Sequence, residues 1–234
     1  LDASDNHLTI LPDEIGMLRH LERLALGDNL LVALPTGIGK LGRLRWLDVT
    51  HNRLCRLPDQ LADCHALTAL GLSDCSFRDF PQVVCRLSGL VKLGFFNNGV
   101  STVPREIGLL SNLEKVDFSS NQIGKVDGRL FRSLRMLQFL NLRENPISEI
   151  ADDERCDGRG RLSRSLQKID LQDCRLPYLP AFLFSRPVDL RVCNNPFTEI
   201  IDNSGFEVPR LYALLESANF NNCGTNFTDT MGYE

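Results

Sequence analysis

One segment of 23 residues recurs, in variant form, along most of this chain. The clearest copy covers residues 90–112, LVKLGFFNNGVSTVPREIGLLSN, and its general form is L-x-x-L-x-L-x-x-N-x-L-x-x-L-P-x-x-I-G-x-L-x-x. Short units of this kind cannot bury their apolar residues alone, so they must stack against neighbouring copies. The repeat therefore restricts the fold to a row of similar coils that share one continuous core.

The ninth position of the repeat holds Asn or Cys in every copy and defines the register. These residues are Asn6, Asn29, Asn52, Cys75, Asn98, Asn121, Asn145, Cys174 and Asn195. Their spacing is 23 residues five times, then 24, 29 and 21. Periods of this length with this pattern are typical of leucine-rich repeats, in which each unit adds one strand to a parallel sheet. We therefore expect an α/β leucine-rich-repeat solenoid (horseshoe) of about nine repeats, with a parallel β-sheet on its concave side.

Each position of the repeat has a predicted structural role. In residues 67–89, the residues expected to point inward are Leu67, Leu70, Leu72, Phe77, Phe80, Val83 and Leu87. An inward Asn can both donate and accept hydrogen bonds to the backbone, whereas Cys does so weakly, so we expect weaker links at Cys75 and Cys174. The Leu-Pro step starts a convex return of loops and short helical turns, in which Gly16, Gly39 and Gly108 are expected to allow tight bends.

The repeat also predicts the domain boundaries. Residues 1–200 form the repeat domain and residues 201–234 form a C-terminal cap and tail. Apolar residues of the first copy, such as Leu1 and Leu8, have no copy before them, which implies a fragment or pairing through that end. An insertion at 151–165 carries acidic residues followed by arginines, and two readings remain open: a solvated insertion, or a loop that contacts a partner or regulates binding.

Composition restricts the function. The net charge of -4 argues against a nucleic-acid-binding surface, and no stretch of about 18 apolar residues predicts membrane insertion. The eight cysteines lie singly, without C-x-x-C pairs, so we expect reduced thiols and an intracellular, cytoplasmic protein. The histidines, of which His65 beside Cys64 comes nearest to a cluster, form no metal-binding or catalytic pattern. We therefore expect no catalytic residues, no metal site, no cofactor and no enzyme activity.

The predicted binding surface is the concave face, where side chains between the inward leucines alternate toward solvent. Lysines recur at the third position and acidic residues at the fifth and eighth positions, so the face is expected to be striped by charge. The candidate partner-binding residues are Trp46, Phe96, Phe139, Lys92, Lys115, Asp48, Asp117, His51 and Arg143. Exposed aromatic residues beside Ala69, Gly71 and Gly94 would form a groove for a protein or peptide. The alternative is that the aromatic rings fold over neighbouring strands as ordinary cover.

Two segments, ALPTGIGKLGRLRWLDVTHNRLCRLP (33–58) and TVPREIGLLSNLEKVDFSSNQIGKV (102–126), carry a family resemblance. They resemble intracellular leucine-rich-repeat proteins that include the Ras-pathway scaffold Shoc and the polarity scaffolds Scribble and Erbin. The resemblance covers about residues 1 to 200 and implies a non-catalytic scaffold or adaptor. Extracellular members usually carry paired cysteines in a C-terminal cap, and the lack of such pairs here favours the intracellular branch.

A narrower resemblance lies in the tail. Pro209 is followed by Leu211, Leu214 and Leu215 at helical spacing, which predicts a short amphipathic helix at 209–219 that covers the last coil. The segment VPRLYALLES is similar to the Elongin C-docking helix of leucine-rich-repeat substrate receptors of cullin ubiquitin ligases, with Leu211 in the place of the anchoring Leu. Leu215 and Arg210 depart from that family pattern, in which Cys and a small residue are usual. The resemblance implies an alternative function as a ubiquitin-ligase substrate receptor.

Overall fold

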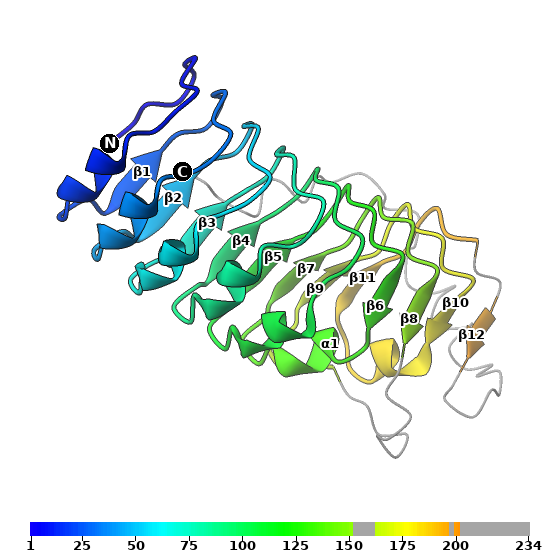
Figure 1. Cartoon of the computed structure of the whole chain (residues 1–234). Coiled ribbons are helices and arrows are strands. Elements are labelled where there is room, and N and C mark those ends of the chain that lie inside the picture. Colours follow the sequence, from blue (N-terminus) through cyan, green and yellow to red (C-terminus); the bar gives the residue numbers. More distant parts are fainter. Residues whose placement is uncertain (152–161, 197–198, 202–234) are drawn as a thin grey trace.

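The computed structural model describes residues 1–151, 162–196 and 199–201, and shows successive coils stacked in one row (Figure 1). One side of the stack is an eight-stranded parallel sheet. Its strands, in spatial order, are β1 (Arg23–Ala25), β2 (Trp46–Asp48), β3 (Ala69–Gly71), β4 (Lys92–Gly94), β5 (Lys115–Asp117), β7 (Phe139–Asn141), β9 (Lys168–Asp170) and β11 (Asp189–Arg191). A parallel bridge between Asp2 and Ala25 extends the sheet into the first coil. The predicted solenoid with a parallel sheet is confirmed.

Every strand of this sheet uses the same three positions of the repeat. The middle residue points inward, and the strand residues with no exposed surface are Leu24, Leu47, Leu70, Leu93, Val116, Leu140 and Ile169. The register holds even across the longest spacing, because Phe139 of β7 pairs with Lys168 of β9. The sequence repeat therefore predicts which side chains share a row on the concave face.

On the convex side, the first five returns are short 3-10 helices, each preceded by a proline. They are η1 (Asp13–Met17), η2 (Thr36–Lys40), η3 (Asp59–Asp63), η4 (Gln82–Arg86) and η5 (Arg105–Leu109). The glycines in these turns allow close packing of coils rather than the expected bend. A Cβ atom on Gly16 would lie 2.5 Å from the carbonyl oxygen of Gly37, and one on Gly39 would collide with the carbonyl oxygen of Gln60.

The later returns differ from the expected loops and helical turns. Two small parallel sheets form there: β6 (Lys125–Asp127) pairs with β8 (Glu149–Ala151), and β10 (Tyr178–Pro180) pairs with β12 (Glu199–Ile201). The α-helix α1 (Leu130–Ser133) follows β6, and the 3-10 helix η6 (Ala181–Phe184) follows β10. At β6 the segment KVDGRLFRS replaces the Pro-containing step and carries no repeat signature, whereas β10 ends on Pro180 of a Leu-Pro step, so the sequence pattern predicted neither strand.

The core is continuous along the stack, as the repeat predicts. The seven inward residues named for 67–89 are all buried, with at most 7% of their surface exposed. Phe80 packs against Phe95 and Phe118, with ring centroids 5.1 and 5.9 Å apart. At the N-terminal end, Leu11 and Ile15 are buried, whereas 55% of Leu1 is exposed. The coils thus share their apolar residues, and the first coil leaves part of its own uncovered.

From Asn29 onward, the side chain of each inward Asn joins two coils. Asn52 Nδ2 donates hydrogen bonds to the carbonyl oxygens of Leu26, Val49 and Thr50, at 2.9, 3.1 and 3.1 Å. The backbone N–H of Leu31 donates to Asn52 Oδ1 at 2.8 Å. Only 6% of Asn52 is exposed, so these bonds satisfy polar backbone groups that water does not reach.

Cysteine makes a weaker link at the same position, as expected. Cys75 Sγ donates one long contact of 3.5 Å to the carbonyl oxygen of Val49, and Cys174 Sγ lies 3.5 Å from the carbonyl oxygen of Leu142. Burial raises the pKa of Cys75 to about 11 and that of Cys174 to about 12, so both remain thiols at neutral pH.

The other cysteines within the described residues form two groups. Cys55, Cys64 and Cys85 are also free thiols, of which Cys55 is exposed. Cys193 is disulfide-bonded, so the expectation that every cysteine is reduced is wrong. A disulfide-bonded cysteine does not favour the reducing compartment that the scattered cysteines predicted. Residues 152–161 of the predicted insertion at 151–165, and the predicted cap helix at 209–219, lie outside the described residues.

Replacing Asn52 by Ala should lower the free energy of unfolding by about 2–4 kcal/mol, because it removes the partner of the buried Leu31 N–H and of the Leu26 carbonyl oxygen. The matched Cys75→Ala change should cost only about 1 kcal/mol, since the thiol supplies one weak contact. Urea unfolding followed by circular dichroism measures both values. Equal losses for the two variants would contradict the proposed role of the Asn side chain.

Thiol labelling should separate the cysteines by burial. In the folded protein, iodoacetamide at pH 8 should modify Cys55 within minutes and leave Cys64 unmodified, because Cys64 is 1% exposed and its pKa is raised by burial to about 11. Peptide mass spectrometry reads out both sites. Labelling in urea provides the control, since both thiols should then react, and fast modification of Cys64 in the native protein would show that the core opens readily.

Candidate functional site

The third position of the repeat forms a row of cations and aromatic rings across the sheet. Pairing places Arg23 beside Trp46, and Lys115 beside Phe139. The guanidinium carbon of Arg23 lies 4.9 Å from the ring centroid of Trp46, and Nζ of Lys115 lies 5.0 Å from that of Phe139. Cations at this distance from an aromatic face are attracted to its π electrons. Both rings are half-buried, so each is partly covered yet keeps an accessible surface.

The room beside one of the small residues between the aromatic rings is filled by a neighbouring side chain. A Cβ atom on Gly71 would lie 2.6 Å from Oδ1 of Asp48, so the carboxylate of Asp48 occupies the room that this glycine leaves. The same oxygen accepts a hydrogen bond of 3.0 Å from the backbone N–H of Thr50. Phe96, at the seventh position of its coil, is half-buried. A carboxylate therefore lies beside Gly71, where the sequence predicted an open groove.

The fifth position is more buried than the sequence predicts. Asp117 and Asp170 are only 2% and 1% exposed, although alternation places them on the solvent side of the sheet. Asp117 Oδ1 accepts hydrogen bonds from the backbone N–H and hydroxyl of Ser119, at 2.8 and 2.6 Å, and Oδ2 accepts one of 3.0 Å from Asn141. Neighbouring side chains cover these short residues. Asp117 therefore lies beneath the surface of the concave face rather than on it.

Burial also changes the acidity of these groups. Loss of solvation raises the pKa of Asp117 and of Asp170 above the usual value, despite the hydrogen bonds that favour the ionised form. Desolvation likewise lowers the pKa of Lys168, which lies in the third-position row. The C-terminal half of the concave face thus holds ionisable groups in a poorly solvated environment.

The eighth position adopts a left-handed backbone in every described coil. The nine residues with positive φ, between 49° and 58°, are Asp5, Asp28, His51, Asp74, Asn97, Ser120, Glu144, Asp173 and Asn194. Polar side chains such as Asp and Asn tolerate this conformation better than branched ones. The left-handed turn places these side chains in a polar ridge along the edge of the sheet.

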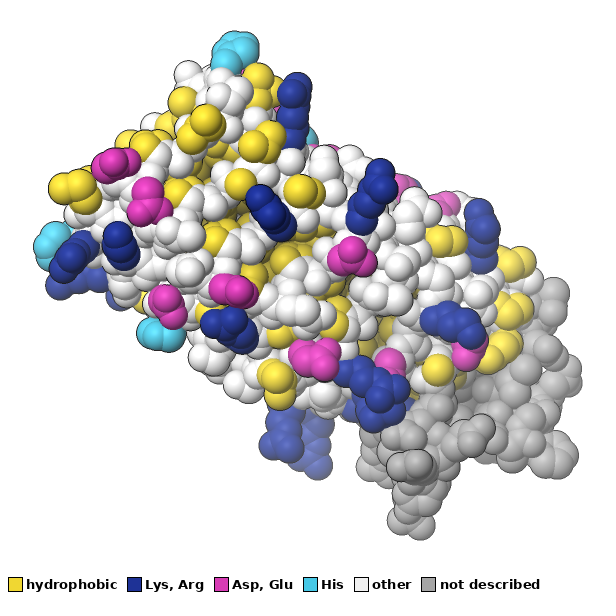
Figure 2. All heavy atoms as spheres, in the orientation of Figure 1, with side chains coloured by type: hydrophobic (Ala, Val, Ile, Leu, Met, Phe, Trp, Pro, Cys, Tyr) yellow, Lys and Arg dark blue, Asp and Glu magenta, His cyan; other side chains and the backbone are white. Residues whose placement is uncertain are grey.

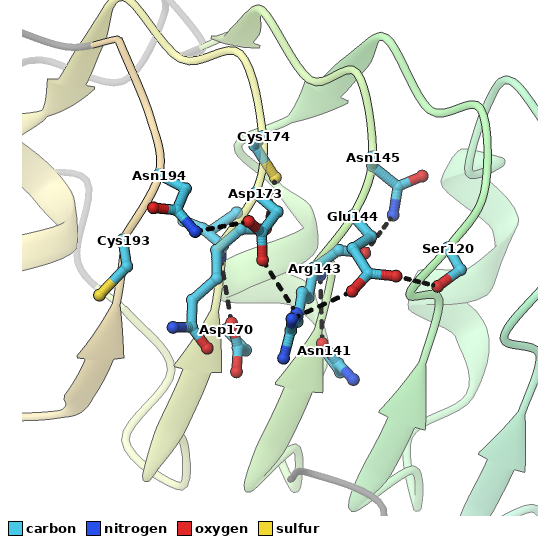
Figure 3. A network of polar contacts seen from close by, with 12 residues as sticks. Ser120, Asn141, Arg143, Glu144, Asn145, Asp170, Asp173, Cys174, Cys193 and Asn194 are labelled. Carbon is cyan, nitrogen blue, oxygen red and sulfur yellow. Dashed lines mark hydrogen bonds and ion pairs between the residues drawn. The ribbon is translucent and has the colours of Figure 1, made fainter. Parts of the chain in front are cut away.

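Side chains of the polar ridge contact one another between coils. His51 Nδ1 lies 3.3 Å from Oδ1 of Asp28, and Nε2 lies 3.0 Å from Oδ2 of Asp74. Arg143, a seventh-position residue, reaches this ridge: it contacts Asp173 and Glu144, each at 3.1 Å (Figure 3). The structure thus places His51 between the carboxylates of Asp28 and Asp74, and Arg143 in ion pairs with Asp173 and Glu144, rather than among the aromatic residues.

The remaining predictions concern Lys92, metal binding, membrane insertion and the Elongin-type residues. Lys92 lies on β4 in the same row as Trp46 and Lys115, as expected. Among the described residues, no group of three or more His, Cys, Asp or Glu side chains could hold a metal ion. No helix in this part of the chain is long and apolar enough to span a membrane. The predicted Elongin-type residues Leu211, Leu214 and Leu215 lie outside the described residues.

The sequence did not single out a pocket on the convex side, next to α1 and η5, where Arg105 and Arg129 meet Asp127. The only signal was the departure of residues 125–133 from the repeat pattern.

Comparison with known families agrees with this geometry. The family model described as leucine rich repeat matches residues 1–54, 19–77 and 88–147, which together cover more than half of the chain. The chain belongs to the leucine-rich repeat family. Leucine-rich repeats are typically non-catalytic modules for protein–protein interaction. No curated protein matched the sequence.

Solved structures of other leucine-rich repeat proteins share the fold. A leucine-rich repeat protein of Leptospira interrogans is 24% identical, with a TM-score of 0.67 over 93% of this chain. TLR13 in complex with ssRNA13 is 25% identical (TM-score 0.69, 80% of this chain), and the plant peptide hormone receptor RGFR1 in complex with RGF2 is 23% identical (TM-score 0.63, 83%). The chain spans 57%, 26% and 35% of the lengths of these three proteins.

The raised pKa of Asp117 gives a prediction for stability. Because the folded protein holds the proton more tightly than the unfolded chain, this group favours folding at low pH, and its contribution falls as the pH rises above about 4 toward its folded pKa. Wild-type protein should therefore lose more unfolding free energy between pH 4 and pH 7 than Asp117→Asn. Urea unfolding at several pH values measures the difference, and parallel curves would contradict it.

Asp13 is the internal control for a direct measurement of the Asp117 pKa by NMR, because the pKa of Asp13 is shifted in the opposite direction. The backbone N–H of Gly37 and the hydroxyl of Thr36 donate to Asp13 and lower its pKa. Carboxyl-carbon NMR should therefore show Asp117 titrating above, and Asp13 below, the ordinary value of about 3.9.

Proposed function

We propose that this chain is a scaffold or adaptor module that binds an extended segment of a partner protein across its concave sheet. The observation that carries the proposal is the third-position row, in which one cation–aromatic pair joins β1 to β2 and a second joins β5 to β7 on the same surface. Large, partly buried aromatic rings with arginine or lysine beside them are the side chains that dominate the energy of protein interfaces. They supply apolar contact area together with a charged group that selects the partner.

The charges of the row indicate the partner's character. Arg23, Lys92, Lys115 and Lys168 supply four cations from β1 to β9, and the first acid in the row is Asp189 of β11. Because strands lie about 4.8 Å apart, a segment that crosses the sheet would meet these residues in turn. A segment with acidic side chains and an apolar anchor would complement this row.

Two other partners receive less support. The solved TLR13 complex contains RNA, but the net charge of -4 and the acids of the polar ridge here would repel a phosphate backbone. The ubiquitin-ligase alternative depends on Leu211, Leu214 and Leu215, and it remains a prediction from the sequence.

A photo-cross-linking experiment tests the concave face. A photoreactive amino acid at Ala69, between Trp46 and Lys92 in the row, should cross-link to a partner polypeptide in cell extract. Adding Trp46→Ala should weaken binding of that partner about thirtyfold, the effect of removing an interface anchor worth about 2 kcal/mol. Trp46 is the only tryptophan, so its fluorescence should change when the purified partner binds.

The matched control places the same photoreactive group at Thr102, an exposed position of the fifth coil outside the sheet. Leu109→Ala, which removes an exposed apolar side chain of η5, should leave affinity unchanged. Cross-links that arise only from Thr102, or that survive Trp46→Ala at full strength, would contradict the proposed site. Products sensitive to ribonuclease would indicate RNA instead.

A further inference from the structure

A second candidate site lies outside the concave sheet, where the form of the convex return changes. A cavity of about 200 Å³ lies between η5 of one coil and β6 and α1 of the next. In the first five coils a 3-10 helix packs against another 3-10 helix, whereas here η5 meets a strand followed by an α-helix. The two shapes do not match, and a cavity remains. Figure 2 shows hydrophobic side chains in a recess that runs along the stack in this view.

The close contact between η5 and α1 closes one end of the cavity. A Cβ atom on Gly108 would lie 2.8 Å from Oγ of Ser133, so the glycine allows the two helices to touch. The floor is apolar: Ile107, Val126 and Leu130 are buried, with 2%, 2% and 6% of their surface exposed. This floor can receive an apolar group without breaking any hydrogen bond.

Charged side chains line the wall of the cavity. Asp127 Oδ2 lies 3.2 Å from Nε of Arg105, and Oδ1 lies 3.3 Å from Nε of Arg129. The backbone N–H of Arg129 also donates to Asp127 Oδ1 at 2.9 Å. The contact to Asp127 uses Nε of Arg105, and 71% of the Arg105 side chain is exposed to solvent. An incoming carboxylate can therefore reach the terminal N–H groups of Arg105 without having to displace Asp127.

We propose that this convex pocket binds an apolar side chain with a carboxylate beside it, presented by a short acidic segment of a partner protein. The apolar floor takes the side chain and Arg105 pairs with the carboxylate. The volume is smaller than the range of about 300–1,000 Å³ that holds drug-sized ligands, so it suits one or two side chains. The pocket would give the protein a second contact surface that is independent of the concave row.

Methyl NMR of the full chain tests the proposal with defined probes. The peptide acetyl-Gly-Leu-Glu-Gly-amide should shift the methyl signals of Ile107, Val126 and Leu130 in a saturable manner. The isosteric Leu-Gln peptide, which lacks the charge, should bind about tenfold more weakly, as loss of one charge-assisted hydrogen bond implies. The Arg105→Glu variant should lose the preference for the Glu peptide.

Arg86→Glu is the matched control. Arg86 ends η4 one coil earlier and pairs with Asp59 at 3.5 Å, so the variant makes the same charge change outside the pocket. It should keep the wild-type preference for the Glu peptide. Equal binding of the two peptides, or an unchanged preference in Arg105→Glu, would overturn the proposal. Methyl shifts with hexanoate but not with either peptide would also overturn it, because they would identify a pocket for small amphipathic anions.

Discussion

The stack depends on the amide side chain that most coils place between themselves and the preceding coil. Asn52 makes four hydrogen bonds to backbone groups, and two of them belong to the preceding coil. Leaving those groups buried without partners would cost more than most single packing contacts provide. The same side chain holds the backbone just after the left-handed residue of the polar ridge. Strand register, ridge geometry and the continuous core therefore rest on one repeated set of hydrogen bonds.

The sequence predicted the fold well because that set recurs at a fixed position. The spacing of the Asn and Cys residues predicted that Trp46, Lys92 and Phe139 lie in one row. The structure pairs the strands that carry them in that order. The spacing of the repeat could not predict which of these side chains are exposed to solvent. Alternation places Asp117 toward solvent, but its burial depends on the size of side chains from neighbouring coils, and the room beside Gly71 is filled by Asp48. Such contacts across coils carry no local signature.

The concave and convex faces carry different kinds of side chains and surfaces. The concave face carries cations and aromatic rings in one row, with buried carboxylates beneath them and ion-paired acids along the ridge. The convex face is regular for five coils and then changes to strands and α1, which creates the pocket beside Arg105. Regular repeats favour a uniform surface, so the departures from the repeat are the places where a distinct binding site can form.

The pairing of Phe139 with Lys168 has a consequence for how this architecture accommodates changes in chain length. The coil between them is longer than those before it, yet the two strands meet in the same register as their neighbours. The extra residues between these strands therefore do not shift the register of the sheet. An insertion on the back of the solenoid can thus alter one surface while the alignment of side chains on the front is preserved, so the two surfaces can diversify separately.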